Sequence, residues 1–164
     1  MTAPIDIEFT VNGRPVRLSL PPRMTLIDCL RDELGLTGSH IGCEHGVCGA
    51  CSVMLDGVPV RSCLIFAVQV DGSSVTTVEG LVRPDGGLSP LQEAFRDCHA
   101  MQCGYCTPGM LIAAQGLLDE NPDPSDADIR EAISSNLCRC TGYQQIVEAV
   151  RLAATRRNAG ADNG

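Results

Sequence analysis

Apolar and polar residues alternate near the start of the chain, which is the pattern of strands that bury one face. Residues 5–11 alternate in this way, reach the turn dipeptide Asn12-Gly13 and continue as residues 15–20. This arrangement predicts a β-hairpin. Thr25 is a suitable N-cap for a following helix, which we expect to run to about Leu34.

A glycine-rich loop and more strands follow this helix. Residues 38–51 are rich in Gly and Cys and lack any periodicity, so they are expected to form a loop. A second hairpin is predicted from residues 51–55 and 58–62, which flank Asp56-Gly57. Residues 75–78 have the composition of one more short strand. The pattern therefore predicts an α+β unit that ends near residue 79.

Beyond a Gly- and Pro-rich stretch at residues 80–88, the periodicity becomes helical. Four helices are expected: one from Ser89-Pro90 with Gln92 completing a capping box, one from Thr107-Pro108 to Glu120, one from Ser125 with Ile129, Ile133 and Leu137 on one stripe, and one from a capping box at Thr141 to about Ala154. Four helices in about 65 residues predict a compact bundle. We therefore divide the chain into a first domain (1–79), a linker (80–88), a helical domain (89–157) and a flexible tail (158–164).

Composition and charge exclude several classes of function. The net charge is −8 and the chain contains no lysine, so binding to nucleic acid is not expected. No apolar run approaches the roughly 20 residues of a membrane-spanning helix. The first residues also lack the basic and apolar segments of a secretory signal, which predicts a cytoplasmic protein. In that compartment disulfides are rare, so clustered cysteines more often bind metal or perform redox chemistry.

The first group of cysteines has the spacing C-x4-C-x2-C-x11-C, formed by Cys43, Cys48, Cys51 and Cys63. Its first three members have the spacing of plant-type ferredoxins, in which four thiolates hold a 2Fe–2S cluster. Structural zinc sites usually consist of paired knuckles that are farther apart. A Rieske centre would need two histidines, and only His45 lies in this loop, so His45 is expected to be solvated.

The second group of cysteines consists of Cys103, Cys106, Cys138 and Cys140, and each of its two pairs precedes a predicted helix. Helix N-termini favour thiolates and anionic clusters, because their N–H groups are unpaired. Two facing helix starts would create a pocket of four sulfur atoms, although spacing alone also permits zinc. The remaining Cys29 and Cys98 lie on apolar helical stripes, so we interpret both as structural.

The motifs together resemble the iron–sulfur subunit of the xanthine oxidase family of molybdenum hydroxylases. The resemblance covers about residues 5–154 and rests on the segments 42–51, 76–80, 102–110 and 136–143. It implies a β-grasp ferredoxin-like domain followed by a four-helix bundle, each with its own 2Fe–2S cluster. It assigns Cys43, Cys48, Cys51 and Cys63 to the first cluster, and Cys103, Cys106, Cys138 and Cys140 to the second. It also implies that Gln102 and the Cys140 region contact the pterin of a molybdenum cofactor on a partner.

The chain contains no G-x-G-x-x-G fingerprint, no P-loop and no catalytic dyad, so no catalytic site is expected within it. The resemblance implies that it passes single electrons from a large molybdopterin-binding subunit, through both clusters, to FAD on a medium subunit. A dimer of such heterotrimers would hydroxylate a small molecule. An N-heteroaromatic substrate is favoured over an aldehyde, a purine or carbon monoxide. Two alternatives remain at this point: a free ferredoxin-type electron carrier and a zinc-stabilised interaction module.

Overall fold

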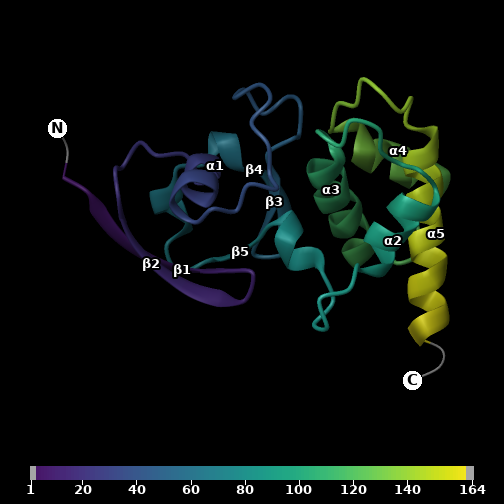
Figure 1. Cartoon of the computed structure of the whole chain (residues 1–164), viewed down its shortest axis with the longest axis horizontal. Helices are drawn as coiled ribbons and strands as arrows, with labels where there is room; N and C mark the ends of the chain where they lie inside the picture. The colour runs from purple at the N-terminus through teal and green to yellow at the C-terminus, as the bar shows by residue number, and fades with distance from the viewer. Residues whose placement is uncertain (1–2, 162–164) are drawn as a thin grey trace.

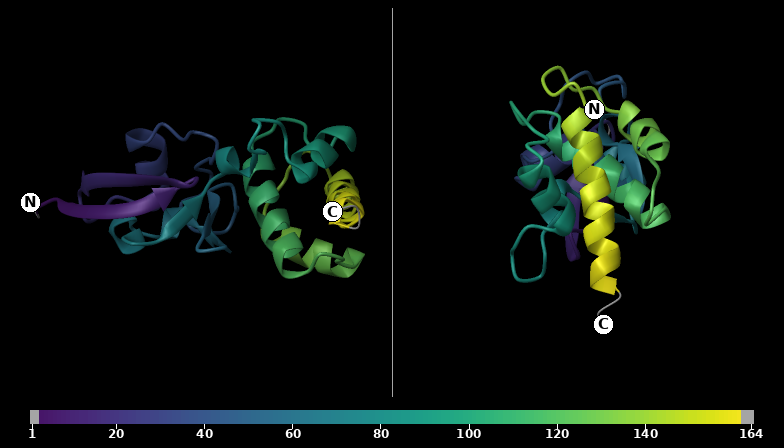
Figure 2. Two further views of the ribbon diagram at one scale, coloured as in Figure 1. Left: turned by 90° about the horizontal axis from the view of Figure 1, so that it is seen from below. Right: turned by 90° about the vertical axis from the view of Figure 1, so that its right-hand side faces the viewer.

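The protein consists of two halves that lie side by side along its long axis, as the computed structural model of residues 3–161 shows (Figure 1). The N-terminal half contains a mixed β-sheet, whereas the C-terminal half is helical. Figure 2 shows the strands β1 and β2 at one end of the molecule and the last helix at the other. Each half has its own cluster of buried apolar side chains. A sheet half followed by a helical half confirms the α+β class.

Five strands form one sheet in the order β2-β1-β5-β3-β4. They are β1 (Ile5–Val11), β2 (Arg14–Leu20), β3 (Ser52–Leu55), β4 (Val58–Arg61) and β5 (Ser74–Thr76). Both predicted hairpins are confirmed, since β1 pairs with β2 and β3 pairs with β4 in antiparallel register. The central strand β5 runs parallel to β1 and antiparallel to β3. Sequence alternation alone did not predict this mixed pairing.

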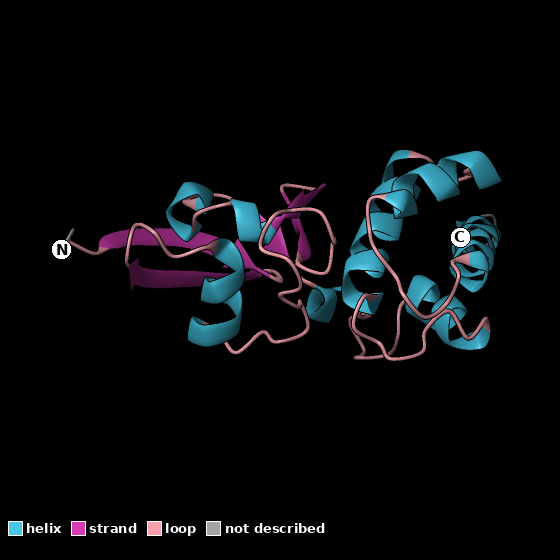
Figure 3. Cartoon of the chain, turned by 90° about the horizontal axis from the view of Figure 1, so that it is seen from above, coloured by secondary structure: helices cyan, strands magenta, loops and turns pink. Residues whose placement is uncertain are grey.

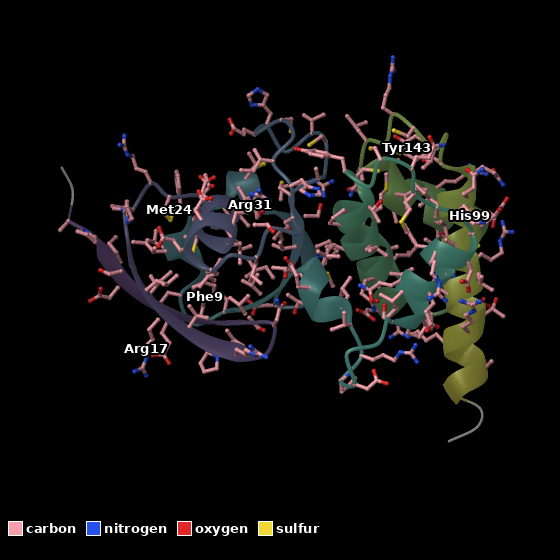
Figure 4. All side chains as sticks on the ribbon, viewed as in Figure 1. Phe9, Arg17, Met24, Arg31, His99 and Tyr143 are labelled. Carbon is pink, nitrogen blue, oxygen red and sulfur yellow. The ribbon has the colours of Figure 1, made fainter. Side chains whose placement is uncertain are left out.

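The side chains of β1 alternate between the core and solvent, as their pattern predicted. Ile7, Phe9 and Val11 are buried, while the intervening Glu8 is exposed and pairs with Arg17 of β2. Figure 4 shows Phe9 inside the molecule and Arg17 projecting away from it. One face of the sheet therefore builds the core of the N-terminal half.

The predicted helix after Thr25 is present, but its second half has π geometry. The Thr25 hydroxyl caps α1 (Leu26–Asp28) by accepting from the Asp28 N–H at 3.3 Å. A π-helix, η1 (Cys29–Glu33), continues directly from it. This helix buries Cys29 and Leu30 completely against the sheet. The buried environment of Cys29 agrees with the structural role that we predicted for it.

The strand expected at residues 75–78 is shorter, because the chain leaves the sheet after Thr76. The N–H of Thr77 donates to the Asn12 side chain at 2.9 Å instead of continuing the ladder. Three short 3-10 turns, which the sequence did not predict, join the remaining elements: η2 (Ser62–Leu64), η3 (Ala67–Val70) and η4 (Val78–Leu81). Thr77 is fully buried, so the hydrogen bond from its N–H to the Asn12 side chain stabilises the turn at the end of the sheet.

Four helices form the C-terminal half, and Figure 3 shows them gathered beside the sheet. They are α2 (Pro90–Asp97), α3 (Thr107–Glu120), α4 (Asp126–Ser134) and α5 (Gln144–Ala161). The predicted capping boxes at Ser89 and Ser125 are both present. The core between these helices includes the fully buried Phe95, Met110 and Ile146. Within residues 3–161, no helix has the length and apolar character to span a membrane.

Two predictions at the ends of these helices were wrong. The helix α4 ends at Ser134, so Leu137 lies outside it and is 55% exposed. Thr141 does not cap α5, which starts three residues later at Gln144. Its hydroxyl instead donates to the sulfur of Cys138 at 3.0 Å, and the positive φ of Tyr143 separates this loop from the helix.

The last helix is longer than its sequence pattern suggested. It was expected to end near Ala154, yet α5 continues to Ala161, so residues 158–161 of the expected flexible tail (158–164) are helical. Side chains on this extension reach the other helices: Arg156 pairs with Asp97, and Arg157 pairs with Asp119. The remainder of the predicted tail, residues 162–164, lies outside the described residues.

Candidate metal centres

The loops that carry the cysteines project from the same side of the molecule. In Figure 1 the loop before β3 and the loop before α5 both lie along the upper edge. Cys43 and Cys48 lie in the first of these loops, and Cys51 immediately precedes β3. Cys63 lies in the turn η2, directly after β4. The second hairpin thus returns Cys63 to the loop that holds the other three cysteines.

Backbone N–H groups surround the sulfur of Cys43. The N–H groups of His45 and Cys48 each lie 3.4 Å from it. The backbone hydrogen bonds from Cys48 and His45 lower the pKa of Cys43 to about 6. His45 is exposed, as predicted, and contributes its backbone rather than its ring. This loop therefore stabilises negative charge on sulfur.

The other thiols of the first group are less readily ionised. Burial raises the pKa of Cys48, and burial with a hydrogen bond to Cys51 raises the pKa of Cys63 to about 11. The thiols of Cys43 and Cys48 lie close enough to affect each other's pKa, and Cys51 likewise raises the pKa of Cys63. Four thiols thus form two neighbouring pairs.

The second group of cysteines shows the same arrangement in pairs. Cys103 and Cys106 lie in the turn before α3, whereas Cys138 and Cys140 lie in the loop between α4 and α5. The sulfur atoms of Cys103 and Cys140 are 3.6 Å apart. Cys106 and Cys138 lie close enough to affect each other's pKa. The first of these pairs is exposed, and the second packs against the helical core.

Polar groups around Cys138 favour its thiolate form. The Thr141 hydroxyl lies 3.0 Å from its sulfur, and the Thr141 N–H lies 3.5 Å away. Although burial opposes ionisation, these bonds from Thr141 outweigh it and lower the pKa of Cys138. Tyr143, which Figure 4 shows among these loops, accepts from the Cys138 N–H through its hydroxyl at 2.8 Å. In contrast, burial raises the pKa of the partner thiol Cys106 to about 12.

Each group provides four thiols, which is the number of ligands that a 2Fe–2S cluster requires. Within residues 3–161, no three His, Cys, Asp or Glu side chains converge on a point that could hold one metal ion. Structural zinc needs four ligands around one centre, whereas a 2Fe–2S cluster has two irons that share four thiolates. The backbone of Gly42 lies close to the sulfur of Cys48, because a Cβ added at Gly42 would be only 2.9 Å from that sulfur. Both groups of thiols therefore have the chemistry that a 2Fe–2S cluster requires.

The two remaining predicted positions have different surroundings. Gln102 is exposed beside Cys103, so its side chain is open to a partner. Cys98 ends α2, where it packs against the helical core, and burial raises its pKa. Neither Cys98 nor Cys29 joins a group of thiols. The structural interpretation of both cysteines agrees with these surroundings.

Contacts between the halves bring the two cysteine groups together. The N–H of Leu137, next to Cys138, donates to the carbonyl oxygen of Cys48 at 2.9 Å. The buried Asn136 donates from its side chain to the carbonyl oxygen of Gly49 at 3.3 Å. Gly109 of α3 also approaches the Gly49 backbone so closely that a Cβ would lie 2.1 Å from that oxygen. Only one hydrogen bond and the backbone of residues 137–138 therefore separate Cys48 from Cys138.

Sequence reasoning missed several residues of this interface. Asn136 and Gly109 lie within the segments 136–143 and 102–110, which contain the cysteines of the second group. Their position beside these cysteines could have indicated that they belong to the site. Arg61 has no such signal. Its guanidinium bonds to Ser52 in its own half and to the backbone of Ser135 in the other. Such long-range contacts depend on how the two halves pack.

Two family models match the chain. A 2Fe-2S iron-sulfur cluster binding domain matches residues 9–81, and a 2Fe-2S binding domain matches residues 77–151. The two matches together cover both cysteine groups. They agree with the assignment of one cluster to each half of the molecule.

Characterised proteins match over nearly the full length. The chain is 56% identical to the nicotine 6-hydroxylase small subunit of Paenarthrobacter nicotinovorans, covering 89% of this chain and 87% of that protein. It is 54% identical to the caffeine dehydrogenase subunit gamma of Pseudomonas sp. (strain CBB1), covering 88% of each. Among solved structures, quinoline 2-oxidoreductase from Pseudomonas putida 86 has a chain that superposes with a TM-score of 0.92 at 49% identity. That match covers 97% of this chain and 99% of the other.

Proposed function

The chain belongs to the iron–sulfur subunits of the xanthine oxidase family of molybdenum hydroxylases, and we propose that it carries single electrons from a molybdopterin centre to FAD on separate partner subunits. It is an electron-transfer subunit of an oxidoreductase complex rather than an enzyme by itself. The observation that carries this proposal is the presence of two groups of paired thiols joined across the contact between the halves. A 2Fe–2S cluster at each group would supply one-electron oxidation and reduction.

We assign four ligands to each cluster and two ligands to each iron. Cys43, Cys48, Cys51 and Cys63 would hold the first cluster, and Cys103, Cys106, Cys138 and Cys140 the second. The contacts between thiols support the pairs 43 with 48, 51 with 63, 103 with 140 and 106 with 138. The protein supplies N–H and hydroxyl donors that stabilise negative charge on sulfur, and such donors also set cluster potentials.

The exposure of the second group supports a direction for electron flow. Cys103 and Cys140 are exposed beside the exposed Gln102, so this surface can meet a cofactor on another subunit. Cys138 lies deeper and connects to Cys48 through the Leu137 hydrogen bond. Electrons would therefore enter at the exposed pair and leave through the N-terminal half. In this proposal Gln102 and the Cys140 region contact the pterin.

The assembly and the finer domain description are also proposals. We propose a large molybdopterin-binding subunit and a medium FAD-binding subunit, arranged as a dimer of heterotrimers in the cytoplasm. The helix that packs across a mixed sheet supports a β-grasp domain over residues 1–79. The shared core of α2 to α5 supports a four-helix bundle that starts at residue 89. Residues 80–88 would then join the two domains.

The substrate of the complex is proposed to be an N-heteroaromatic molecule. The names of two similar proteins support this choice, since they refer to nicotine and quinoline, whereas caffeine, named for a third, is a purine. The pocket that selects the substrate would lie on the molybdenum subunit. The similarity to small subunits of such enzymes also argues against a free ferredoxin, for which the helical half would have no use.

Cysteine replacement with electron paramagnetic resonance (EPR) tests the proposal. The purified complex should contain about four irons per copy of this chain and, after reduction, show two distinct 2Fe–2S signals. Cys140→Ser should disturb the second signal and leave the first in place. Cys98→Ser is the matched control and should retain both signals. A colourless protein that contains zinc would refute the proposal, whereas loss of the first signal in Cys140→Ser would reverse the assignment of the clusters.

A further inference from the structure

Arg61 lies at the end of β4, two residues before Cys63, and its partly buried side chain joins both halves of the molecule. Its Nε donates to the carbonyl oxygen of Gly46 at 3.3 Å. Its two terminal nitrogens donate to the Ser52 hydroxyl and to the carbonyl oxygen of Ser135. One guanidinium therefore holds the loop of the first cysteine group, the strand β3 and the end of α4.

The first of these bonds continues to the sulfur of Cys43. The carbonyl of Gly46 and the N–H of Val47 belong to the same peptide group. This N–H contributes, after those of Cys48 and His45, to lowering the pKa of Cys43. When a cation bonds to the oxygen of a peptide, it polarises the N–H at the other end and strengthens the bond that this N–H donates. Arg61 thus acts on Cys43 through one peptide unit.

The second bond continues to the sulfur of Cys48 by a similar route. The Ser52 hydroxyl, which accepts from Arg61, donates to the carbonyl oxygen of Gly49 at 2.6 Å. That carbonyl shares its peptide group with the N–H of Ala50, which acts on the pKa of Cys48 by lowering it against the larger effect of burial. Both routes therefore start at one guanidinium and end on the two thiols that we assign to one iron.

The charge of Arg61 is not neutralised by a carboxylate. Among residues 3–161, the ion pairs involve other arginines, and none includes Arg61. Reduction adds one negative charge to a cluster, and a nearby cation stabilises that additional charge.

We infer that Arg61 is a positioning residue that fixes the first cluster loop against the helical half and favours the reduced state of the iron held by Cys43 and Cys48. This inference rests on the proposed function, because it requires a cluster at the first group of thiols. It also gives the contact between the halves a role in electron flow. A more easily reduced first cluster draws electrons out of the second half.

The test is a redox titration of the intact complex, followed by EPR at low temperature. Arg61→Gln should lower the equilibrium constant for reduction of the first cluster about tenfold, equivalent to about 59 mV for one electron, and should change the second cluster far less. Arg61→Lys retains the charge and should therefore recover a large part of this loss. Arg23→Gln removes an equal charge from an exposed position and should leave both potentials unchanged.

A fourth variant separates the two routes and guards against misfolding. Ser52→Ala keeps the charge of Arg61 and breaks only the route to Cys48, so it should give a smaller shift than Arg61→Gln. If Arg61→Gln does not assemble a first cluster, the shifts in Arg61→Lys and Ser52→Ala decide the matter. The role of the charge would be overturned if the first cluster had the same reduction potential in Arg61→Gln as in Arg23→Gln. It would also be overturned if the potential were the same in Arg61→Lys as in Arg61→Gln. Absence of two signals in the unmodified complex would instead refute the proposed function.

Discussion

The contact between Gly109 and Gly49 provides a sharp test of how the two halves are held together. Gly109 lies in the first turn of α3, and a Cβ added there would be 2.1 Å from the carbonyl oxygen of Gly49 and 2.8 Å from Nδ2 of Asn136. Real Cβ atoms do not approach other atoms within 3.0 Å. The substitution Gly109→Ala therefore requires a movement of about 0.9 Å between α3 and the Gly49 backbone. No flexible side chain can absorb this movement, because the obstructing atom belongs to the backbone.

The expected cost follows from this geometry. If the halves stay together, overpacking costs about 2–3 kcal/mol. If they separate, the hydrogen bonds from Leu137 to Cys48 and from Asn136 to Gly49 are stretched beyond useful length, which costs a similar amount. Alanine regains about 1 kcal/mol because it is a better helix former than glycine. The net loss of stability is therefore about 1–2 kcal/mol.

This loss can be measured by thermal unfolding of the iron-loaded protein. For a chain of this length, about 1–2 kcal/mol corresponds to a decrease of roughly 2–8 °C in the midpoint. The variant Gly87→Ala is the control, since its added Cβ meets only side-chain atoms at 3.1 Å or more, and its midpoint should hardly change. The magnetic interaction between the two reduced clusters should also weaken in Gly109→Ala. A midpoint equal to or above that of the unmodified protein, with unchanged interaction, would refute the reasoning.

Two further variants test single interactions in the helical half. The pKa of Asp126 is lowered by its hydrogen bond to Arg151, so this pair stabilises the fold above the unfolded pKa of about 4 and loses its effect as the pH falls through the lower, folded value. The difference in unfolding midpoint between the unmodified protein and Asp126→Asn should therefore be present at pH ~6 and shrink towards pH ~3; a difference that grows on acidification would contradict the assignment. Tyr143→Phe leaves the Cys138 N–H without its 2.8 Å partner, which should cost about 1–2 kcal/mol and alter only the second EPR signal. An unchanged second signal in this variant would show that the hydroxyl does not act on the site.

The sequence by itself determined the local elements and the chemistry of the cysteine groups. Alternation and turn dipeptides located both hairpins, because these signals involve neighbouring residues. The capping boxes at Ser89 and Ser125 located two helix starts for the same reason. The spacing of the cysteines indicated two metal centres. Each of these features depends on residues that are close in sequence.

Local patterns failed where a side chain or backbone group had a distant partner. The capping box expected at Thr141 did not form, since its hydroxyl bonds to the sulfur of Cys138. The helix α5 passed its expected end, and Arg156 and Arg157 on this extension pair with residues of other helices. The parallel pairing of β5 with β1 is likewise a contact between distant segments.

Only the tertiary structure decided how the two cysteine groups face each other. The hydrogen bond from Leu137 to Cys48 joins residues that are 89 positions apart in the sequence. The bond from Arg61 to Ser135 joins residues that are 74 positions apart. Such contacts arise from the packing of one half on the other, and neither periodicity nor composition encodes them in a readable form. The sequence therefore located the two cysteine groups, whereas the packing of the halves determined the connection between them.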